Sequence, residues 1–463
     1  MTSSELNPLA PWARQLPADW GRCRLDAVAD VLFSNVDKHT LDDETPVRLC
    51  NYVDVYKNEQ ITDTIDFMEA SAEPREISKF QIRHGDVLVT KDSETPDDIA
   101  IAALVAQELP GVLCGYHLAL IRPRSCRVSG PFLYWLHASK AFRAQYEAKA
   151  VGVTRWGLSQ HTFRELLIAL PTLPEQERIT AYLDASCASI GAAVAAKRRQ
   201  LDTLHTLWKT TITQAVTQGL DPARERRPSD VDWFGDIPEH WRCEHLKRFT
   251  VRIQTGTTPP TDTPDYYFDG TIPWFAPGSY DGDLELREPR KLINELALRD
   301  GALRMFPAGT VFLIGIGATI GKVGLIIEPA SCNQQIIGIV TNHRMVGRFL
   351  AYQLKIYEDV IPGVAVSTTL PIFDQVMTEY LPVLQPPREE QYAICEFLDA
   401  KSVETQRIAA VIQQQIDTLI AYRKSLIHEC VTGQRRITEA DVRAIEQRAA
   451  KLVPDSIEEL SHA

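Results

Sequence analysis

The chain has 463 residues, which is too long for one ordinary domain and predicts two or three hydrophobic cores. Hydrophobic residues make up 44% and charged residues 24%, which is typical of a folded soluble protein. We find no apolar run of the ~18 residues that cross a bilayer, and residues Met1 to Leu9 show no signal pattern. We therefore expect a cytoplasmic protein without membrane contact. The formal charge of −12 excludes a protein that coats nucleic acid by bulk electrostatics, although a local basic face would still permit sequence-specific DNA binding.

The predicted elements alternate between mixed domains and long helices. In chain order we expect an N-terminal segment with a first mixed domain (1–172), a helical arm (173–219), a hydrophilic linker (220–236), a second mixed domain (237–385), a second helical arm (386–436) and a short charged, helix-prone tail (437–463). The mixed domains contain β-type runs such as 86–90 and 310–314, and helix-like pieces at 132–145 and 346–357.

An internal duplication is the most informative pattern. Trp12, Leu16, Pro17, Trp20 and Leu25 keep the spacing of Trp233, Ile237, Pro238, Trp241 and Leu246. Residues 174–219 align without a gap on 389–434, which places Glu175 and Gln176 on Glu390 and Gln391, and Leu183, Asp184 and Ala185 on Leu398, Asp399 and Ala400. A period of about two hundred residues is too long for a solenoid, so it indicates two copies of a domain-plus-helix unit.

Both closing segments predict long helices, because after their opening turns they contain no proline and one interior glycine, Gly191. Glutamates in each first turn suit the helix dipole, and we expect Gly219 and Gly433 to end the helices. Each helix should span roughly 40 residues, or about 60 Å. Apolar residues at heptad spacing predict a seam formed by Leu183, Ile190, Val194, Leu201, Leu204, Trp208, Leu398, Ile412, Ile416, Leu419 and Leu426.

A lone amphipathic helix of this length cannot bury its apolar stripe, so we expect the two helices to pack as an antiparallel coiled coil. The alternative is that each helix packs on its own globular domain. The predicted fold class is α+β: two mixed α/β domains separated by two long antiparallel helices, with a pseudo-twofold internal repeat.

Motifs for catalysis and for cofactor binding are missing from the sequence. Residues 315–322 resemble a phosphate-binding loop, but the glycine spacing is wrong and Val323 follows Lys322 where Ser or Thr is required, which favours a glycine-rich turn between two strands. There is no H-E-x-x-H, no G-x-S-x-G and no Asn/Asp-Pro-Pro-Tyr/Phe loop, and the nine cysteines form no C-x-x-C pair. We therefore expect reduced, mostly buried thiols, no catalytic residue, no metal and no cofactor in this chain.

Two divergent domains on duplicated helices, without a catalytic motif, resemble the specificity subunits of type I restriction-modification systems. The resemblance extends to about Gln434, and its most specific parts are residues 231–241 and the two Glu-Gln…Leu-Asp helix openings. In the second domain, residues 255–259, 272–274 and 317–324 look like that family's target-recognition domains. In the first, residues 85–92 match a strand and turn of the same kind, but the acidic stretch 93–99 replaces the usual glycine-rich continuation.

The resemblance implies that each recognition domain reads one half of a split, asymmetric target in double-stranded DNA. It implies that the helical pair sets the gap between the half-sites and docks two modification (methyltransferase) subunits, which restriction/translocase subunits join. S-adenosylmethionine, ATP and Mg are then expected on the partner subunits.

Base reading requires polar or basic side chains on loops or strand ends that face a groove. The candidates are Thr90, Lys91, Thr154 and Arg155 in the first domain, and Thr257, Thr258, Thr319, Lys322, Ser367, Thr368 and Thr369 in the second. The alternative for each of these residues is a structural role in a turn or a solvent-facing position without DNA contact. Trp156 and Trp274 could lie against a sugar or base, and the alternative for these two is core packing.

Two other functions compete with DNA reading. The acidic charge would suit a coiled-coil scaffold whose mixed domains bind other proteins, and a basic, concave face on both domains would argue against it. An enzyme with a nucleotide site at 315–322 is the second alternative, which a nucleotide-binding assay would test.

Overall fold

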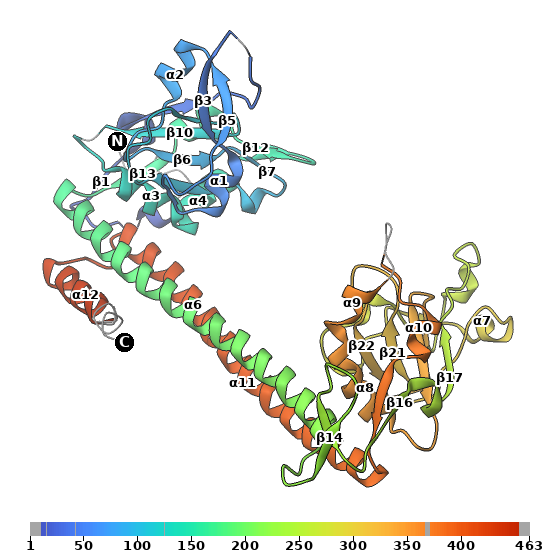
Figure 1. Ribbon diagram of the computed structural model, residues 1–463. Helices are drawn as coiled ribbons and strands as arrows, with labels where there is room; N and C mark the ends of the chain where they lie inside the picture. Colours follow the sequence, from blue (N-terminus) through green and yellow to red (C-terminus); the bar gives the residue numbers. More distant parts are fainter. Residues whose placement is uncertain (1–10, 15, 42, 125, 366–370, 453–463) are drawn as a thin grey trace. The chain divides into compact units, whose positions relative to one another are not determined.

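The computed structural model describes residues 11–14, 16–41, 43–124, 126–365 and 371–452 (Figure 1). The chain divides into two compact units: unit 1 contains residues 1–198 and 414–463, and unit 2 contains residues 199–413. Both boundaries fall inside the long helices, α6 (Leu173–Gln218) and α11 (Arg388–Val431). Each unit therefore consists of one mixed domain together with a part of each long helix.

The mixed domain of unit 1 is built on a five-stranded sheet. The strand order is β2 (Ala29–Phe33), β10 (Leu118–Pro123), β6 (Val87–Thr90), β8 (Ala102–Val105) and β4 (Gln60–Ile61). β8 and β4 are parallel, and the other neighbouring strands are antiparallel. The remaining strands are β5 (Met68–Ala72), β3 (Thr45–Cys50) and β9 (Val112–Cys114) in one sheet, β11 (Val151–Gly152), β12 (Trp156–Gly157) and β7 (Asp92–Ser93) in another, and the pair β1 (Gly21–Arg24) and β13 (Leu167–Leu170). The helices are α1 (Tyr52–Lys57), α2 (Pro74–Phe80), α3 (Gly130–Ala138), α4 (Lys140–Glu147) and α5 (Gln160–Arg164).

Unit 2 has the corresponding sheet in the order β17 (Thr250–Thr255), β24 (Ile336–Thr341), β21 (Val311–Ile314), β22 (Val323–Ile326) and β19 (Glu285–Leu286). Its smaller sheets contain β20 (Lys291–Ile293), β18 (Ile272–Phe275) and β23 (Ser331–Cys332), the pair β16 (Arg242–His245) and β25 (Pro382–Gln385), and the pair β14 (Arg226–Pro228) and β15 (Asp236–Pro238). Its helices are α7 (Glu295–Arg299), α8 (Gly347–Leu354), α9 (Ile361–Val364) and α10 (Gln375–Glu379).

The two mixed domains share one topology although their sequences barely resemble each other. β2, β3, β4, β5, β6, β8, β9 and β10 correspond in chain order to β17, β18, β19, β20, β21, β22, β23 and β24, with the same neighbours and the same pairing directions. β6 and β21 are buried at every residue, which is why both read as continuous apolar runs.

A glycine pair marks the same close backbone approach in both domains. A Cβ at Gly130 would lie 1.9 Å from the carbonyl oxygen of Gly85, and a Cβ at Gly347 would lie 2.1 Å from that of Gly309. Gly85 and Gly309 also have positive φ angles of 84° and 81°. Glycine is therefore required at corresponding places in the two copies.

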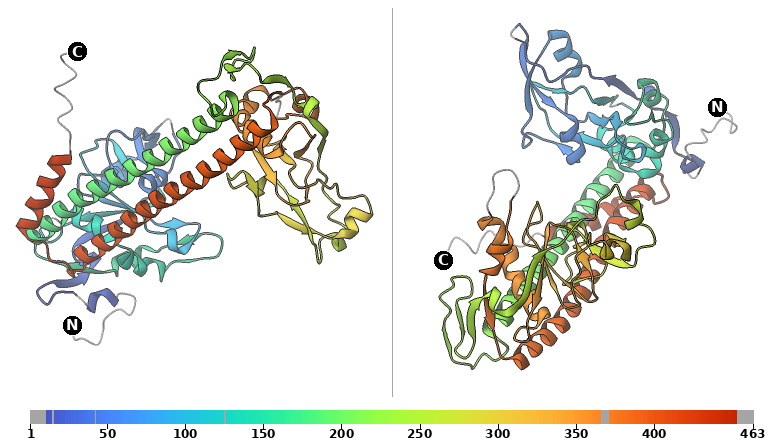
Figure 2. Two further views of the ribbon diagram at one scale, coloured as in Figure 1. Left: turned by 90° about the horizontal axis from the view of Figure 1, so that it is seen from below. Right: turned by 90° about the vertical axis from the view of Figure 1, so that its right-hand side faces the viewer.

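The two long helices pack against each other within each unit, and Figure 2 shows them side by side. In unit 1, Leu183 and Ile190 of α6 share a core with Leu426 and Val431 of α11, and in unit 2 the end of α6 shares a core with the beginning of α11. The beginning of one helix thus lies beside the end of the other, which confirms the antiparallel pairing. The helices have 46 and 44 residues.

The same cores also include residues of the mixed domains, so each helix packs on a domain as well as on its partner. Among the predicted seam residues, Leu183, Ile190, Leu398, Ile416 and Leu426 are buried, and Val194, Leu201, Leu204, Trp208, Ile412 and Leu419 are partly buried.

Each long helix begins with the same buried network. In unit 1, Gln176 accepts a hydrogen bond from Ser129 N (2.9 Å) and donates to Arg127 O (3.0 Å) and Pro171 O (2.9 Å). Glu175, the residue before Gln176 in the first turn of α6, accepts a hydrogen bond from Trp20 Nε1 (3.0 Å).

In unit 2, Gln391 accepts from Val346 N (2.7 Å) and donates to Arg344 O and Pro386 O (both 2.9 Å), while Trp241 Nε1 donates to Glu390 Oε2 (2.9 Å). These contacts explain why Glu-Gln and Trp recur in both copies.

The two glycines that were expected to end the long helices lie at the helix ends in the structure. Gly219 directly follows α6 and Gly433 lies two residues after the end of α11, with φ angles of 74° and 71°. Gly219 packs against Trp241 as Gly433 packs against Trp20.

The hydrophilic linker expected at 220–236 is structured in part. β14 pairs with β15, Phe234 is 3% exposed within the second core, and Arg227 Nη2 donates to Trp241 O (2.9 Å). Its polar composition concealed a short hairpin anchored by one aromatic residue. The tail forms α12 (Glu439–Leu452), whose Val442 and Ile445 pack against the core of unit 1.

The expectation that no segment is long and apolar enough to cross a bilayer is corrected by α6. Within the described part of the chain, an 18-residue window of α6, with a mean hydropathy of 1.4, is long and apolar enough to cross a membrane by length and composition alone. Core helices of soluble proteins pass the same test, and 39% of this window is buried. The pattern by itself therefore assigns no membrane span.

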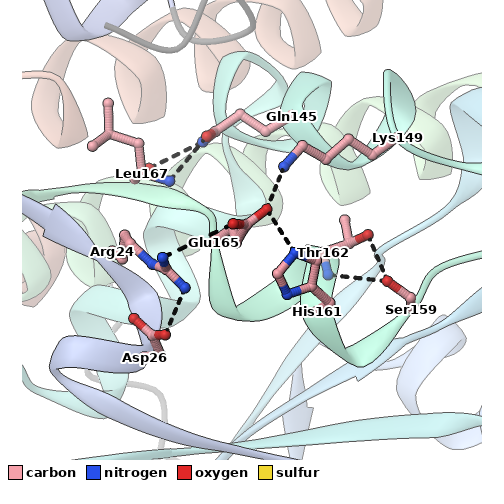
Figure 3. A network of polar contacts seen from close by, with 9 residues as sticks. All are labelled: Arg24, Asp26, Gln145, Lys149, Ser159, His161, Thr162, Glu165 and Leu167. Atoms are coloured by element: carbon pink, nitrogen blue, oxygen red, sulfur yellow. Dashed lines mark hydrogen bonds and ion pairs between the residues drawn. The ribbon is translucent and has the colours of Figure 1, made fainter. Parts of the chain in front are cut away.

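A polar network centred on Glu165 joins the elements next to α6 (Figure 3). Its carboxylate lies 3.9 Å from Arg24 Nη1 and 3.6 Å from Lys149 Nζ. Beside it, the Gln145 amide donates to Leu167 O and accepts from Leu167 N, both at 3.0 Å. These contacts tie β1, α4, α5 and β13 together at the point where the chain enters α6.

Candidate nucleic-acid interface

The loop end of the large sheet in unit 1 gathers several of the predicted residues. Thr90 is fully buried at the end of β6, and its hydroxyl accepts a hydrogen bond from Ile101 N (3.0 Å). Our assignment of Thr90 to base reading is therefore wrong, because this strand end points its side chain into the domain.

Lys91 is half-buried beside two aromatic rings. Its Nζ donates to Ser34 O (3.3 Å) and lies 5.0 Å from the ring centre of Phe33 and 4.5 Å from that of Tyr116. Burial lowers the pKa of Lys91, with the Asp92 carboxylate opposing that shift. Lys91 thus places a cation at the loop end.

Asp92 connects the β11–β12 hairpin to the loop before β10. Its side chain is 17% exposed and accepts from Arg155 Nη2 (2.9 Å), and the other carboxylate oxygen lies 2.7 Å from His117 Nδ1. Arg155 and Thr154 are exposed at the hairpin tip, next to Val153, which is 93% exposed. The structure thus brings Lys91 and Arg155 together at Asp92, with Thr154 next to Arg155 at the hairpin tip.

Aromatic side chains border this end of the domain. Tyr52 and Tyr56 of α1 stack with ring centres 5.6 Å apart, and Tyr56 and Tyr116 are about half exposed at 43% and 51%. Burial, followed by the negative charge of Asp98, raises the pKa of Tyr52. Flat, exposed rings of this kind offer contact area to a sugar or base.

In unit 2 the corresponding loop end carries two threonines, and the Arg304 guanidinium donates to Thr255 O beside them. Thr257 Oγ1 accepts from Arg304 N (3.0 Å), and the exposed Thr258 donates to the Gln334 side chain. Trp274 is 7% exposed and donates through Nε1 to Thr257 O (2.9 Å), so it packs in a core and fixes this loop. Trp156 is partly buried in the first domain.

Thr319 and Lys322 lie on the turn between the antiparallel strands β21 and β22, which confirms the predicted glycine-rich turn at 315–322. Lys322 is exposed and lines a cavity with Trp208 and Lys355, on the side of the domain that packs against the helices of its own unit. Lys322 thus has a different environment from that of Thr257. Ser367, Thr368 and Thr369 lie outside the described residues.

All nine cysteines are free, most of them are buried, and burial raises the pKa of the Cys114 and Cys332 thiols. Within residues 11–452, apart from the gaps noted above, no group of three or more His, Cys, Asp or Glu side chains could hold a metal ion.

Comparison with known proteins explains the two-copy architecture. The sequence profile described as "Type I restriction modification DNA specificity domain" matches residues 19–193 and 249–418. The chain belongs to this family. Each matched range covers one mixed domain and a long part of the helix that follows it, so the chain contains two specificity domains.

Individual relatives are more distant. A curated relative, the type I restriction enzyme MjaIX specificity subunit of Methanocaldococcus jannaschii, is 28% identical over 170 residues, which is 36% of this chain and 38% of that protein. The aligned region thus covers well under two thirds of the relative.

Two solved structures are also similar. One, described as "Structural basis underlying complex assembly and conformational transition of the type I R-M system", has a TM-score of 0.70 at 19% identity and covers 90% of this chain and 98% of its own. The HsdS subunit from Thermoanaerobacter tengcongensis has a TM-score of 0.48 at 20% identity, over 91% and 98% of the two chains. The likeness to the first structure supports the fold described above.

The sequence did not single out the loops that precede β10 and β24. These loops carry Tyr116 and His117 in the first specificity domain, and Asn333, Gln334 and Gln335 in the second. They have no residue in common, so the duplication was invisible there. Pairing the two domains strand by strand, from the buried apolar runs that precede each loop, would have found them.

Proposed function

We propose that this chain is the DNA specificity subunit of a type I restriction-modification complex, and that each specificity domain reads one half of a split target in double-stranded DNA. One observation carries the proposal: the two domains have the same strand topology but present unlike polar side chains at equivalent loop ends. A constant framework with two different sets of base-contacting groups suits an asymmetric bipartite site.

The paired helices suit the role of a spacer and a docking surface. Helices of 46 and 44 residues correspond to about 69 and 66 Å of rise. Their duplicated sequences place related residues at equivalent positions of the two helices, so we propose that two modification subunits dock there and that restriction/translocase subunits join them. S-adenosylmethionine, ATP and Mg would then be bound by these partners, in the cytoplasm.

The acidic net charge argues that the chain alone binds DNA weakly. Arg155 and His117 are already engaged with Asp92, so the loop end of the first domain is not strongly cationic. We propose that the modification subunits supply most of the phosphate contacts. Tight site-specific binding by the isolated chain would contradict this part of the proposal.

The test is to co-express the chain with its modification subunit in a host that lacks adenine methylation, and to map methylated adenines by single-molecule sequencing. A culture with the modification subunit alone is the control. A new motif with two unlike half-sites at fixed spacing supports the proposal. No methylation by a soluble, stable complex would favour a scaffold without DNA reading.

A further inference from the structure

The loops before β10 and β24 are held by the same backbone hydrogen bonds. Gly115 N donates to Cys50 O (2.9 Å), and Asn333 N donates to Phe275 O (3.0 Å). The loops close in the same way, since Leu118 N donates to Gly115 O (3.1 Å) and Ile336 N to Asn333 O (3.2 Å). Residues 115–117 and 333–335 are therefore structurally equivalent, one to one.

The third residue of each loop is fixed by the end of the central strand. Lys91 N donates to His117 O (3.2 Å), and Gly315 N donates to Gln335 O (2.8 Å). The carbonyl groups of Lys91 and Gly315 in turn accept from Leu158 N (2.9 Å) and Phe373 N (2.8 Å). His117 and Gln335 thus occupy the same backbone position in two domains that share one topology but differ in sequence.

Both side chains are held in place by an acidic or amide neighbour. His117 Nδ1 lies 2.7 Å from Asp92 Oδ2, and the imidazole is 41% exposed. Asn333 Nδ2 donates to Gln335 Oε1 (2.8 Å), and Asn333 Oδ1 accepts from Gln335 N (3.1 Å). Asn333 therefore determines which end of the Gln335 amide is the carbonyl and which is the amine.

Gly317 lies next to the Gln335 amide. A Cβ at Gly317 would lie 3.4 Å from Gln335 Nε2, and Gly317 has a φ of 111°. The carbonyl oxygen keeps one lone pair beyond the bond from Asn333, and the amine carries two hydrogens. The amide thus retains both an acceptor and donors for a further partner.

We propose that His117 and Gln335 are the equivalent base-reading positions of the two domains, and that Gln335 reads an adenine in the major groove. An oriented amide matches the adenine edge, because it accepts from the N6 amine and donates to N7. Asn333 is a positioning residue that favours this pattern over its reverse. The inference rests on the proposed function and names the base-reading groups of that site.

The experiment uses the complex of the full chain with its modification subunit. Once the methylated motif of the unaltered complex is known, binding is measured by competition with duplexes that carry each of the four bases at each half-site position. Gln335→Ala should reduce the preference for adenine at one position of one half-site by roughly 10- to 100-fold. Gln335→Glu should shift that preference to cytosine, because a carboxylate accepts from cytosine N4 but cannot donate to adenine N7.

The matched variant lies at the equivalent position of the other domain. His117→Gln should change the base preference in the opposite half-site and leave the half-site read by Gln335 unaltered. Asn333→Ala should weaken the preference for adenine at the same position as Gln335→Ala, and by a smaller factor. Thermal unfolding of each complex verifies that the variants fold.

Unchanged base preferences in both Gln335 variants, or a loss that is spread over both half-sites, would overturn the inference. That outcome would leave the proposed function intact, because the unaltered complex would still define a split motif. If the unaltered complex yields no split motif, the proposed function itself is wrong.

Discussion

Replacing Gln391 by alanine tests how the second domain is joined to its helix. The Gln391 side chain is fully buried and makes three hydrogen bonds, to Val346 N, Arg344 O and Pro386 O. Alanine keeps the helix but removes all three bonds and leaves these backbone groups without that partner. The perturbation is therefore confined to the junction between α8 and α11.

The expected loss follows from these bonds. At roughly 1 kcal/mol net for each bond, Gln391→Ala should lower the free energy of unfolding of unit 2 by about 3 kcal/mol. If no water reaches the junction, the unpaired backbone groups raise the cost to about 5 kcal/mol. Gln176→Ala removes the equivalent bonds and should destabilise unit 1 by a similar amount.

Native-state hydrogen exchange of the full chain in increasing urea is the appropriate assay, because a chain with two units need not unfold in one step. Gln391→Ala should lower protection in the cores of unit 2 and leave β6 of unit 1 unaltered. Gln415→Ala, at an exposed position of α11, is the control and should change stability by less than about 0.5 kcal/mol. A loss below about 1 kcal/mol, or an equal loss in both units, would refute the reasoning.

Three further predictions concern single residues. His137 is fully buried, bonded to Leu133 O (2.7 Å) and Tyr146 OH (2.9 Å), and burial lowers its pKa to about 4. Because the unfolded chain takes up this proton first, near pH 6.5, unit 1 should keep its full stability above that pH and lose about 2 kcal/mol by pH 5. Hydrogen exchange at pH 7 and pH 5 measures this, and an equal loss in His137→Gln would contradict it. Gly433→Ala should destabilise the chain by roughly 1–3 kcal/mol, since φ is +71° and the new Cβ would lie 2.5 Å from Pro17. Gly191→Ala, in a helix interior, should stabilise the chain by roughly 0.5–1 kcal/mol, because apart from the helix's own backbone no atom lies within 4 Å of the added Cβ. Urea denaturation that moved the stability of both glycine variants in the same direction would refute this pair of predictions.

The long helices were predictable because local chemistry specifies them. Heptad spacing, first-turn glutamates and the final glycines act within a few residues of each other, so α6 and α11 could be placed to within a few positions. The choice between a coiled coil and packing on a domain was not local. Both occur, since each hydrophobic core contains residues of both long helices and of the mixed domain.

The base-reading candidates were predicted less well, for a physical reason. Residue type and turn position placed Arg155 and Thr154 at an exposed position, where they stay candidates for base reading. Burial depends on the direction in which a strand end points its side chain, and Thr90 points inward. His117 and Gln335 carry no local signal at all. They become equivalent only after strands from distant parts of the chain have been paired.

By itself, the sequence determined the duplication, the two helical arms and the family resemblance, because these depend on periodicity and on identities at a fixed spacing. Tertiary structure alone decided that two unlike sequences adopt one topology, and which side chains stand at its loop ends. Sheet pairing is a long-range property, since β9 and β3 are neighbours in space but lie more than sixty residues apart in the chain (Arg48 pairs with Val112). A side chain's role at such a loop is therefore fixed by partners that no local pattern encodes.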